Sequence, residues 1–247
     1  MSLKTILVSQ PEPTDLKSPY FDLAEKYDLK IHFRKFINVE GITPREFRSQ
    51  KIELSMFTAV ILTSKTSVDH FFRISEETRF KVPDAMKYFC MSEAVAYYLQ
   101  KYVVYRKRKI FFGKTNINDL MDLLKKHKHE NYLLPCSDIL RKIIPDALDE
   151  NNIRFSKAVL YRTVAADLSD LQNVEYDLLV FFSPSGIESL FKNFPGFKQK
   201  ETKIAAFGPT TANAVKKHNL KLEIHAPLPK APSMTMAIEH YIKNSKK

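Results

Sequence analysis

The chain carries one sequence pattern twice. Residues 57–72 read FTAVILTSKTSVDHFF, and residues 176–191 read YDLLVFFSPSGIESLF. Aligned without a gap, both stretches keep an aromatic residue, a polar residue, four apolar residues and then a run with apolar residues at helical spacing. A weaker echo follows, in which residues 87–100 correspond to residues 203–217. Self-similarity on this length scale predicts two domains of one fold rather than a short-period solenoid, and such chains usually bind a ligand in the cleft between their domains.

The composition is that of a globular protein that we expect to stay in the cytoplasm. A chain of 247 residues lies near the ~250–300 residues at which one hydrophobic core gives way to two. No apolar run approaches the ~18 residues of a membrane span. The apolar segment 5–9 is also shorter than the ~7–15 residues of a signal-peptide core. In the cytoplasm Cys90 and Cys136, which both end apolar runs, are expected to be buried, reduced thiols.

The net charge of +11 indicates an anionic partner. Nucleic acid, acidic lipid and a polyanionic small molecule would each be attracted by such a surface. The single dense basic run, residues 105–109, is either a loop that contacts nucleic acid or a solvated turn. The other Lys and Arg residues are scattered, which favours a cleft that attracts carboxylates over a groove that follows a phosphate backbone.

Strand-like apolar runs alternate with amphipathic, helix-like runs along the whole chain. We expect extended segments at 6–9, 30–36, 59–63, 88–90, 110–112, 133–136, 156–164, 178–182, 204–207 and 222–225. We expect helices at 19–27, 67–73, 93–100, 117–126, 138–150, 187–194, 210–218 and 234–244. This alternation predicts an α/β fold with parallel sheets and helices on both faces. The short, fully apolar strands agree with it, because parallel strands are buried on both sides.

The repeat extends further when the sequence is read circularly. Residues 109–127 match 221–242 as strand, loop and helix. Residues 131–161 match 4–36 as strand, loop, helix and strand. Two similar, flavodoxin-like domains with parallel sheets are therefore expected, one of them a circular rearrangement of the other.

The circular match also predicts the domain boundaries. One domain is continuous, 38–164, and the other is split into 1–37 plus 165–247. The chain crosses between them twice, near 37–43 and 161–167, as a two-stranded hinge. A double crossing is a good hinge, since few contacts need to bridge the domains.

Three expected strand ends carry hydroxyl or glycine residues at the start of a helix. Ser183 is predicted to cap a helix with Pro184 in its first turn, and Gly208 with Pro209 holds the equivalent position one strand further. Ser64 aligns with Ser183 in the repeat. Unpaired backbone N–H groups and hydroxyls at the carboxyl edge of a parallel sheet form an anion site. The alternative is plain helix capping, worth about 1 kcal/mol for each cap.

Several common catalytic motifs fail. Residues 113–115 resemble the end of a phosphate-binding loop, but Arg108 stands where that loop requires glycine. Ser185 lacks the flanking glycines of a hydrolase nucleophile. His127 and His129 show no Cys or acidic ligand pattern around them and are interpreted as a solvated helix end. We therefore expect neither metal nor cofactor, and an enzyme here would act mainly by positioning its substrate.

Five segments together resemble the uroporphyrinogen-III synthase family. They are LPC at 134–136, RKIIPDAL at 141–148, LYRTVA at 160–165, FFSPSG at 181–186 and AAFGPTTANAV at 205–215. The resemblance covers essentially the whole chain, and its most specific part is FFSPSG followed by GPTTA at successive strand ends. It implies two α/β domains joined by a two-stranded linker, with the active site in the cleft.

The resemblance also implies a reaction. Members of the family act on hydroxymethylbilane, a linear tetrapyrrole with acetate and propionate groups. They expel its terminal hydroxyl as water, form a spiro intermediate, invert the last ring and close the macrocycle as uroporphyrinogen III, whereas unassisted closure yields isomer I. A basic surface suits such a substrate. A transient contact with hydroxymethylbilane synthase is expected, and no contact with nucleic acid or membrane.

The same resemblance assigns candidate site residues. Tyr161 matches the tyrosine that is proposed in the family to hydrogen-bond or protonate the leaving hydroxyl. The candidate substrate-binding residues are Thr63, Ser64, Ser183, Ser185, Gly186, Gly208, Thr210 and Thr211. Arg141 matches a family arginine, with a solvated helix face as the alternative. At 92–96 the chain reads SEAVA where members commonly have a GNATA-like turn, so a threonine contact is lost and Glu93 would repel a carboxylate.

Two other functions stay open. The main alternative is a two-domain protein that binds an anionic ligand in the same cleft without turnover. A nucleic-acid binder ranks below it, because residues 105–109 lack the interleaved aromatic residues on which bases stack.

Overall fold

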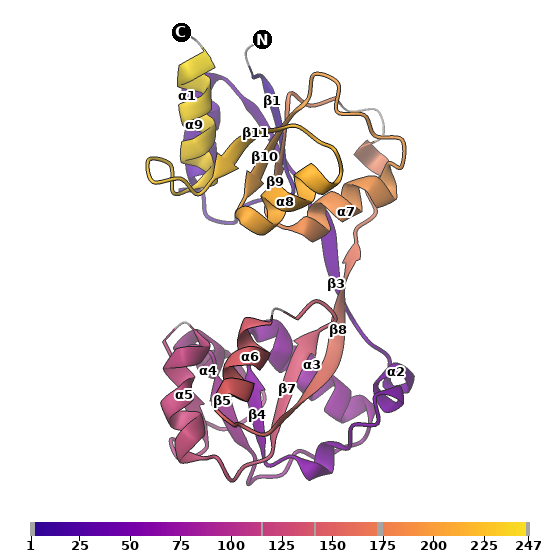
Figure 1. Ribbon diagram of the computed structural model, residues 1–247, viewed down its shortest axis with the longest axis vertical. Helices are drawn as coiled ribbons and strands as arrows, with labels where there is room; N and C mark the ends of the chain where they lie inside the picture. Colours follow the sequence, from indigo (N-terminus) through magenta and orange to yellow (C-terminus); the bar gives the residue numbers. More distant parts are fainter. Residues whose placement is uncertain (1–2, 115, 141, 172–174, 246–247) are drawn as a thin grey trace. The chain divides into compact units, whose positions relative to one another are not determined.

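The protein, described by a computed structural model over residues 3–114, 116–140, 142–171 and 175–245, divides into two compact units (Figure 1). Unit 1 comprises Met1–Asn38 and Val164–Lys247, and unit 2 is the continuous stretch Val39–Thr163. The sequence predicts boundaries after residues 37 and 164.

Unit 1 is built on a five-stranded parallel sheet. The strands are β1 (Thr5–Val8), β2 (Lys30–Phe33), β9 (Leu178–Phe181), β10 (Lys203–Phe207) and β11 (Leu222–Ala226). Their order is β11-β10-β9-β1-β2, and each neighbouring pair is parallel. The chain proceeds from β1 to β2 on one side and from β9 to β11 on the other, so the strand order reverses between β1 and β9.

Helices cover both faces of the unit 1 sheet (Figure 1). They are α1 (Pro19–Tyr27), α7 (Pro184–Asn193), α8 (Pro209–Lys217) and α9 (Met234–Ser245). Val8 and Val180 belong to the core beneath α1 and α9, whereas Leu7 and Phe181 belong to the core beneath α7 and α8. Residues 7 and 8 point to opposite faces because side chains alternate along a strand, which is why these strands need to be apolar throughout.

Unit 2 is built on a six-stranded sheet in the order β3-β8-β7-β4-β5-β6. The strands are β3 (Ile37–Gly41), β4 (Ala59–Leu62), β5 (Lys87–Cys90), β6 (Ile110–Phe112), β7 (Tyr132–Ser137) and β8 (Phe155–Ala165). Strands β4 to β8 are mutually parallel, and the order reverses between β4 and β7. Strand β3 is antiparallel to β8, because the bonds Ile42 N–H to Leu160 O (3.0 Å) and Ala166 N–H to Phe36 O (2.9 Å) run in opposite order along them. The chain passes between the units through β3 and β8.

Helices also cover both faces of this second sheet. They are α2 (Pro44–Ser49), α3 (Lys65–Glu77), α4 (Glu93–Leu99), α5 (Ile117–Lys126) and α6 (Ile143–Glu150), with short 3-10 turns at Leu54–Met56 and, in unit 1, Ser169–Leu171. Helices α2, α3 and α4 share a core with Val60 and Leu160, and α5 and α6 share one with Ile61 and Leu134. Of the helices in the described ranges, none is long and apolar enough to cross a membrane.

The predicted fold class is confirmed, since both sheets are mainly parallel and carry helices on both faces. The helix predicted at 138–150 is wrong at its beginning, because it starts only at Ile143. Asp138 is tied to β8 instead: its N–H donates to Tyr161 O (3.1 Å), and its Oδ1 accepts the Thr163 N–H (3.2 Å). The strand predicted at 30–36 likewise ends earlier, at Phe33.

Helix α2 was not expected, and β3 was expected only as part of the two-stranded hinge near 37–43, not from an apolar run. The residues of β3 are exposed or half-buried, so the strand lacks the apolar run by which the others were found. Helix α2 has a capping box, in which the Glu46 N–H donates to Thr43 Oγ1 (3.2 Å) and the Thr43 N–H donates to Glu46 Oε2 (2.8 Å). Thr, Pro and Glu in this spacing are a helix-start signature readable in the sequence.

The prediction for the two cysteines is confirmed. Cys90 and Cys136 are free and buried. Burial raises the pKa of the Cys90 thiol to about 12 and that of the Cys136 thiol to about 11. Neither is therefore a ready thiolate nucleophile at neutral pH.

Candidate functional site

A pocket of about 420 Å³ lies at the carboxyl edge of the unit 2 sheet. Among its lining residues, Thr63 follows β4, Met91 follows β5 and Ser137 ends β7. The pocket thus spans the place where the strand order reverses between β4 and β7. Open α/β sheets bind ligands there, because the connections on the two sides diverge and leave a crevice.

Most of the pocket lining is apolar. Ile117, Leu140 and Ile144 line it together with Ile139 and Ile143, which are 59% and 67% exposed. Exposed isoleucine costs about 25 cal/mol for each Å² of apolar surface in water, so a flat apolar ligand that covered these side chains would be stabilised. The polar lining groups are Thr63, Asn116, Ser137 and Tyr161. A mainly apolar pocket with a few polar groups is the usual form of a small-molecule site.

Tyr161, on β8, brings a phenol to this pocket. Burial raises its pKa, and a hydrogen bond with the Ser64 hydroxyl acts in the opposite direction, so that the pKa stays above its usual value. The phenol is therefore protonated at neutral pH and is an O–H donor. Its ring stacks on the His70 imidazole, with 4.9 Å between the ring centroids. The structure thus brings Tyr161 together with two other predicted site residues, Thr63 and Ser64.

The start of α3, beside this pocket, is a closed helix cap. Ser64 is the N-cap, as predicted, and its Oγ accepts the Ser67 N–H at 3.1 Å. The Ser67 Oγ in return accepts the N–H groups of Thr63 (3.1 Å) and Ser64 (3.0 Å). Because Ser67 already satisfies these backbone groups, the capping interpretation describes this helix start better than the anion-site interpretation. Thr63 lines the pocket, whereas the Ser64 hydroxyl already bonds the Ser67 N–H and the Tyr161 phenol.

In unit 1, three residues meet where the strand order reverses between β1 and β9. Ser183 caps α7 as predicted, and its Oγ accepts the Gly186 N–H at 3.3 Å. A Cβ atom on Gly186 would lie 3.7 Å from both Ser183 Oγ and Ser9 Oγ. Ser9 follows β1 and donates its N–H to Val180 O (2.9 Å) on β9. Two hydroxyls from adjacent strand ends therefore lie beside the first turn of α7.

The start of α8 has no side-chain cap, unlike the start of α3, where Ser64 and Ser67 form a capping box. Gly208 is the N-cap, as predicted, with φ 83° and ψ 154°, a conformation that favours glycine. Glycine has no side chain to cap the helix, so backbone N–H groups of the first turn are free for an anion. Thr210 is exposed in this turn, whereas Thr211 is only 1% exposed. Thr210 can offer its hydroxyl and N–H, while Thr211 faces the core and offers mainly its backbone.

The remaining residues predicted from the sequence lie as follows. Ser185 is half-buried in the first turn of α7. Ser92 is the N-cap of α4, and Glu93 is exposed in its first turn. Arg141 lies outside the described residues. Residues 105–108 are exposed, which is compatible with both interpretations of the basic run.

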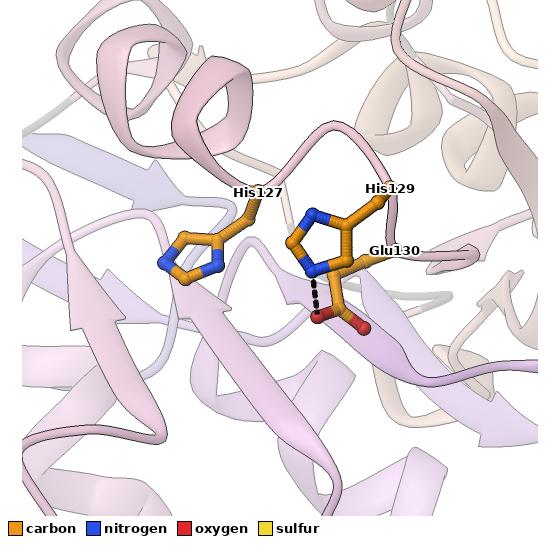
Figure 2. A group of neighbouring side chains, drawn as sticks. All are labelled: His127, His129 and Glu130. Atoms are coloured by element: carbon orange, nitrogen blue, oxygen red, sulfur yellow. Dashed lines mark ion pairs between the residues drawn. The ribbon is translucent and has the colours of Figure 1, made fainter.

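The only His, Cys, Asp or Glu group of metal-binding size that the described residues form is His127, His129 and Glu130, whose ligand atoms lie within 4.8 Å of one another. Figure 2 shows the His129 and Glu130 side chains in contact and the His127 ring beside them. The prediction that no acidic group accompanies the two histidines was therefore wrong, because Glu130, which directly follows His129 in the chain, places a carboxylate oxygen beside them. However, Glu130 is buried and its Oε1 bonds the Lys87 ammonium at 2.5 Å. Lys87 thus already neutralises the carboxylate that a metal ion would need.

Three residues at or beside the candidate sites, Ser9, Ser137 and His70, were not singled out from the sequence. Ser9 and Ser137 each end an apolar strand run, which is the signal that identified Ser64 and Ser183, so both could have been found. His70 carries no such signal, because its stacking partner Tyr161 is distant in the chain.

Comparisons with known proteins identify the family and a shared fold. The family model described as uroporphyrinogen-III synthase HemD matches residues 20–236. The solved uroporphyrinogen-III synthetase from Helicobacter pylori has a TM-score of 0.60 at 17% identity, over 98% of this chain and 100% of that chain. A mutant uroporphyrinogen III synthase from the extremely thermophilic bacterium Thermus thermophilus has a TM-score of 0.52 at 16% identity, over 98% of this chain and 99% of that chain. No curated protein matches significantly. At these identities the structural likeness concerns the fold.

Proposed function

Because this chain belongs to the uroporphyrinogen-III synthase family, the cyclising lyases of tetrapyrrole biosynthesis, we propose that it converts hydroxymethylbilane to uroporphyrinogen III with inversion of the last ring and loss of water. The family match over residues 20–236 carries this proposal. The fold supports it, since two solved synthases match nearly the whole chain. Such a reaction depends on holding a flexible chain in one closing geometry.

Tyr161 is the proposed proton donor. As the carbon–oxygen bond of the hydroxymethyl group breaks, the phenol gives its proton to the departing oxygen, which leaves as water. The electrons of the adjacent pyrrole nitrogen form the azafulvene, and the pyrrole N–H proton returns to the phenolate. The azafulvene carbon then accepts electrons from the substituted carbon of the last ring, which starts its inversion. A protonated phenol at the edge of an apolar pocket supports this role.

The substrate carboxylates are proposed to bind at the strand ends of both units. In unit 1 the groups are the open first turn of α8, with Gly208, Thr210 and the Thr211 backbone, and the first turn of α7, with Ser9, Ser183, Ser185 and Gly186. In unit 2 they are the hydroxyls of Thr63 and Ser64. The net charge of +11 supports the attraction of a polycarboxylate. The apolar pocket lining would pack against the pyrrole rings.

The decisive experiment supplies hydroxymethylbilane freshly made by its synthase, adds this protein, oxidises the products and separates the porphyrin isomers by chromatography. We expect mostly isomer III. Isomer I alone, formed at the spontaneous rate in the presence of folded protein, would contradict the proposal. The alternative, an anion-binding protein without turnover, would then be tested by binding of a stable linear tetrapyrrole.

Two finer parts of the proposal concern the surroundings of the reaction. We place it in the cytoplasm, and we propose that the substrate passes from hydroxymethylbilane synthase during a transient contact. The tendency of the free substrate to close spontaneously supports such a transfer. In a coupled assay the share of isomer I should stay low when the solution is diluted, and a share that rises in proportion to dilution would show release into bulk solvent instead.

A further inference from the structure

The ring of Tyr161 is supported by a second ring that does not face the pocket. The imidazole of His70, on α3, stacks on the phenol with 4.9 Å between centroids and an interplanar angle of 21°. Tyr161 lines the pocket, whereas His70 is not among the described residues that line it. His70 therefore limits how the phenol can tilt or turn without being placed to touch a ligand itself.

Arg73 in turn holds His70. Its Nε donates to His70 Nδ1 at 3.1 Å, and one terminal nitrogen donates to Leu160 O at 3.0 Å. The other terminal nitrogen donates to Glu77 Oε2 at 2.7 Å. Leu160 directly precedes Tyr161 in β8. One guanidinium thus holds both the stacked imidazole and the backbone that carries the phenol.

These contacts define one state of the imidazole. Burial lowers the pKa of His70, and the positive charge of Arg73 lowers it further, against smaller opposite effects of Asp69 and Glu77. The ring is therefore neutral at pH 7. Because Nδ1 accepts from Arg73, the single ring proton lies on Nε2. A neutral imidazole in one tautomer and one orientation is a well-defined support for the phenol.

Gly41, at the end of β3, leaves the space that the guanidinium occupies. A Cβ atom at this position would lie 2.6 Å from Arg73 Cζ and 2.7 Å from its Nε. Any other residue at position 41 would therefore displace the guanidinium. Arg73 consequently joins three elements, α3, β3 and β8, around the tyrosine.

We propose that His70 and Arg73 are positioning residues for Tyr161: His70 fixes the plane of the phenol, and Arg73 fixes His70. This inference rests on the proposed function, in which the phenol assists departure of the substrate hydroxyl. An arginine that donates in three directions cannot be replaced by a lysine, whose charge is a single point. A misplacement of about 1 Å at the reacting group costs about 10²-fold in rate, so a loose phenol would slow the reaction without weakening substrate binding.

The first test measures kcat and KM for isomer III formation in variants of the full chain. His70→Leu keeps the volume but removes the aromatic face, and we expect kcat to fall about 10–100-fold with KM within about 3-fold. His70→Phe restores a stacking ring and should return kcat to within about 3-fold of the wild type. Arg73→Lys should lower kcat about 10-fold. Arg48→Lys, at an exposed arginine of α2, is the matched control and should change nothing. Full kcat in His70→Leu, or equal losses in His70→Leu and His70→Phe, would overturn the proposal.

A double-mutant cycle separates positioning from a general loss of structure. In a Tyr161→Phe background there is no phenol to position, so adding His70→Leu should lower kcat by no more than about 2-fold. The same loss in both backgrounds would show that His70 acts independently of the phenol, and the proposal would be wrong.

A spectroscopic test distinguishes failure of this inference from failure of the proposed function. With 3-fluorotyrosine placed at position 161, the fluorine NMR signal reports the surroundings of the ring whether or not the protein turns over substrate. We expect His70→Leu to shift or broaden this signal and Arg48→Lys to leave it unchanged. If the wild type formed only isomer I, the proposed function would be wrong, but the fluorine signal would still report whether His70 positions the ring of Tyr161. An unchanged fluorine signal in His70→Leu would overturn the positioning role by itself.

Discussion

Units 1 and 2 share an arrangement of five parallel strands, but α3 of unit 2 and α8 of unit 1 begin differently at the carboxyl edges of their sheets. In unit 2 the N–H groups of Thr63 and Ser64 are already bonded by Ser67, and the pocket beside them offers apolar side chains and the Tyr161 phenol. In unit 1 Gly208 leaves the start of α8 without a side-chain cap. The proposed proton donor thus lies in unit 2, and a helix start without a side-chain cap lies in unit 1. Gly208 aligns with Ser92 in the repeat, and neither residue caps its helix with a side-chain hydrogen bond. The contrast therefore lies between two different helix starts of one fold.

The largest effect should come from the phenol of unit 2. Tyr161→Phe removes the proposed proton donor and should lower kcat about 10²–10⁴-fold, the usual contribution of general acid catalysis, while binding of a stable linear tetrapyrrole stays unchanged. Tyr97→Phe, at a tyrosine that is 75% exposed on α4, is the matched control. Isomer III formation and equilibrium binding are the measurements. A Tyr161→Phe enzyme with near-normal kcat would contradict the proposal that the phenol of unit 2 is the proton donor.

The second effect tests the open helix start of unit 1. Gly208→Ala meets no atom within 4 Å, but its φ of 83° strains any residue with a Cβ, which costs about 1–3 kcal/mol of unfolding free energy. Gly196→Ala, also without an atom within 4 Å, is the matched control and should change stability by less than about 0.5 kcal/mol. Chemical denaturation measures both. Equal stability of the two variants would mean that α8 can begin in another conformation.

The third effect tests the closed helix start of unit 2. Ser67→Ala leaves the N–H groups of Thr63 and Ser64 without the acceptor that the structure shows, and the lost cap should cost about 0.5–2 kcal/mol. The KM for substrate should stay within about 3-fold, since these N–H groups are not the proposed carboxylate site. Steady-state kinetics and denaturation measure the two quantities. A KM that fell sharply would indicate that the freed N–H groups bind the substrate. A single residue, Ser67, would then account for the difference between the starts of α3 and α8.

The smallest effect is on the pH dependence of stability, and it concerns Asp177 and Thr58, which precede β9 and β4 at the amino edges of the two sheets. Asp177 aligns with Thr58 in the repeat. The Asp177 carboxylate accepts the N–H groups of Lys4 and Thr5 at 2.8 Å, whereas Thr58 Oγ1 accepts the Asn131 N–H at 2.9 Å. Burial raises the pKa of Asp177, but the bonds from Thr5 and Lys4 outweigh it and bring the pKa below its usual value.

A carboxyl whose pKa is lower in the folded state binds protons more weakly there than in the unfolded chain. Its stabilising contribution is complete above the unfolded pKa of about 4 and is lost as pH falls through the folded value. Asp177→Asn should therefore lower stability by about 1 kcal/mol at pH 7 and remove part of the acid sensitivity below pH 4. Thr58→Val should lose a similar hydrogen bond without altering the pH dependence. Parallel pH profiles for the wild type and Asp177→Asn would contradict this.

Much of the fold could be predicted from the sequence. The two-fold repeat and the alternation of apolar runs were enough for parallel sheets with helices on both faces, because a strand buried on both sides has to be apolar at every position. The cap residues Ser64, Ser183 and Gly208 were also readable, because a helix start depends on the local chain. Where local signals competed with a distant contact, the prediction was wrong: Asp138 was assigned to a helix, but β8 holds it.

The site itself required the folded chain. Tyr161 could be named from its neighbours in the sequence, yet its support by His70 and Arg73 joins α3 to β8. The approach of Ser9 and Ser183 to the same turn of α7 and the ion pair of Glu130 with Lys87 likewise bring together side chains from different strands and loops. Local periodicity reports which face of an element is buried, but not which element lies opposite. Contacts between distant residues exist only after the strands have taken their order, so tertiary packing decides which polar groups remain free to bind a ligand.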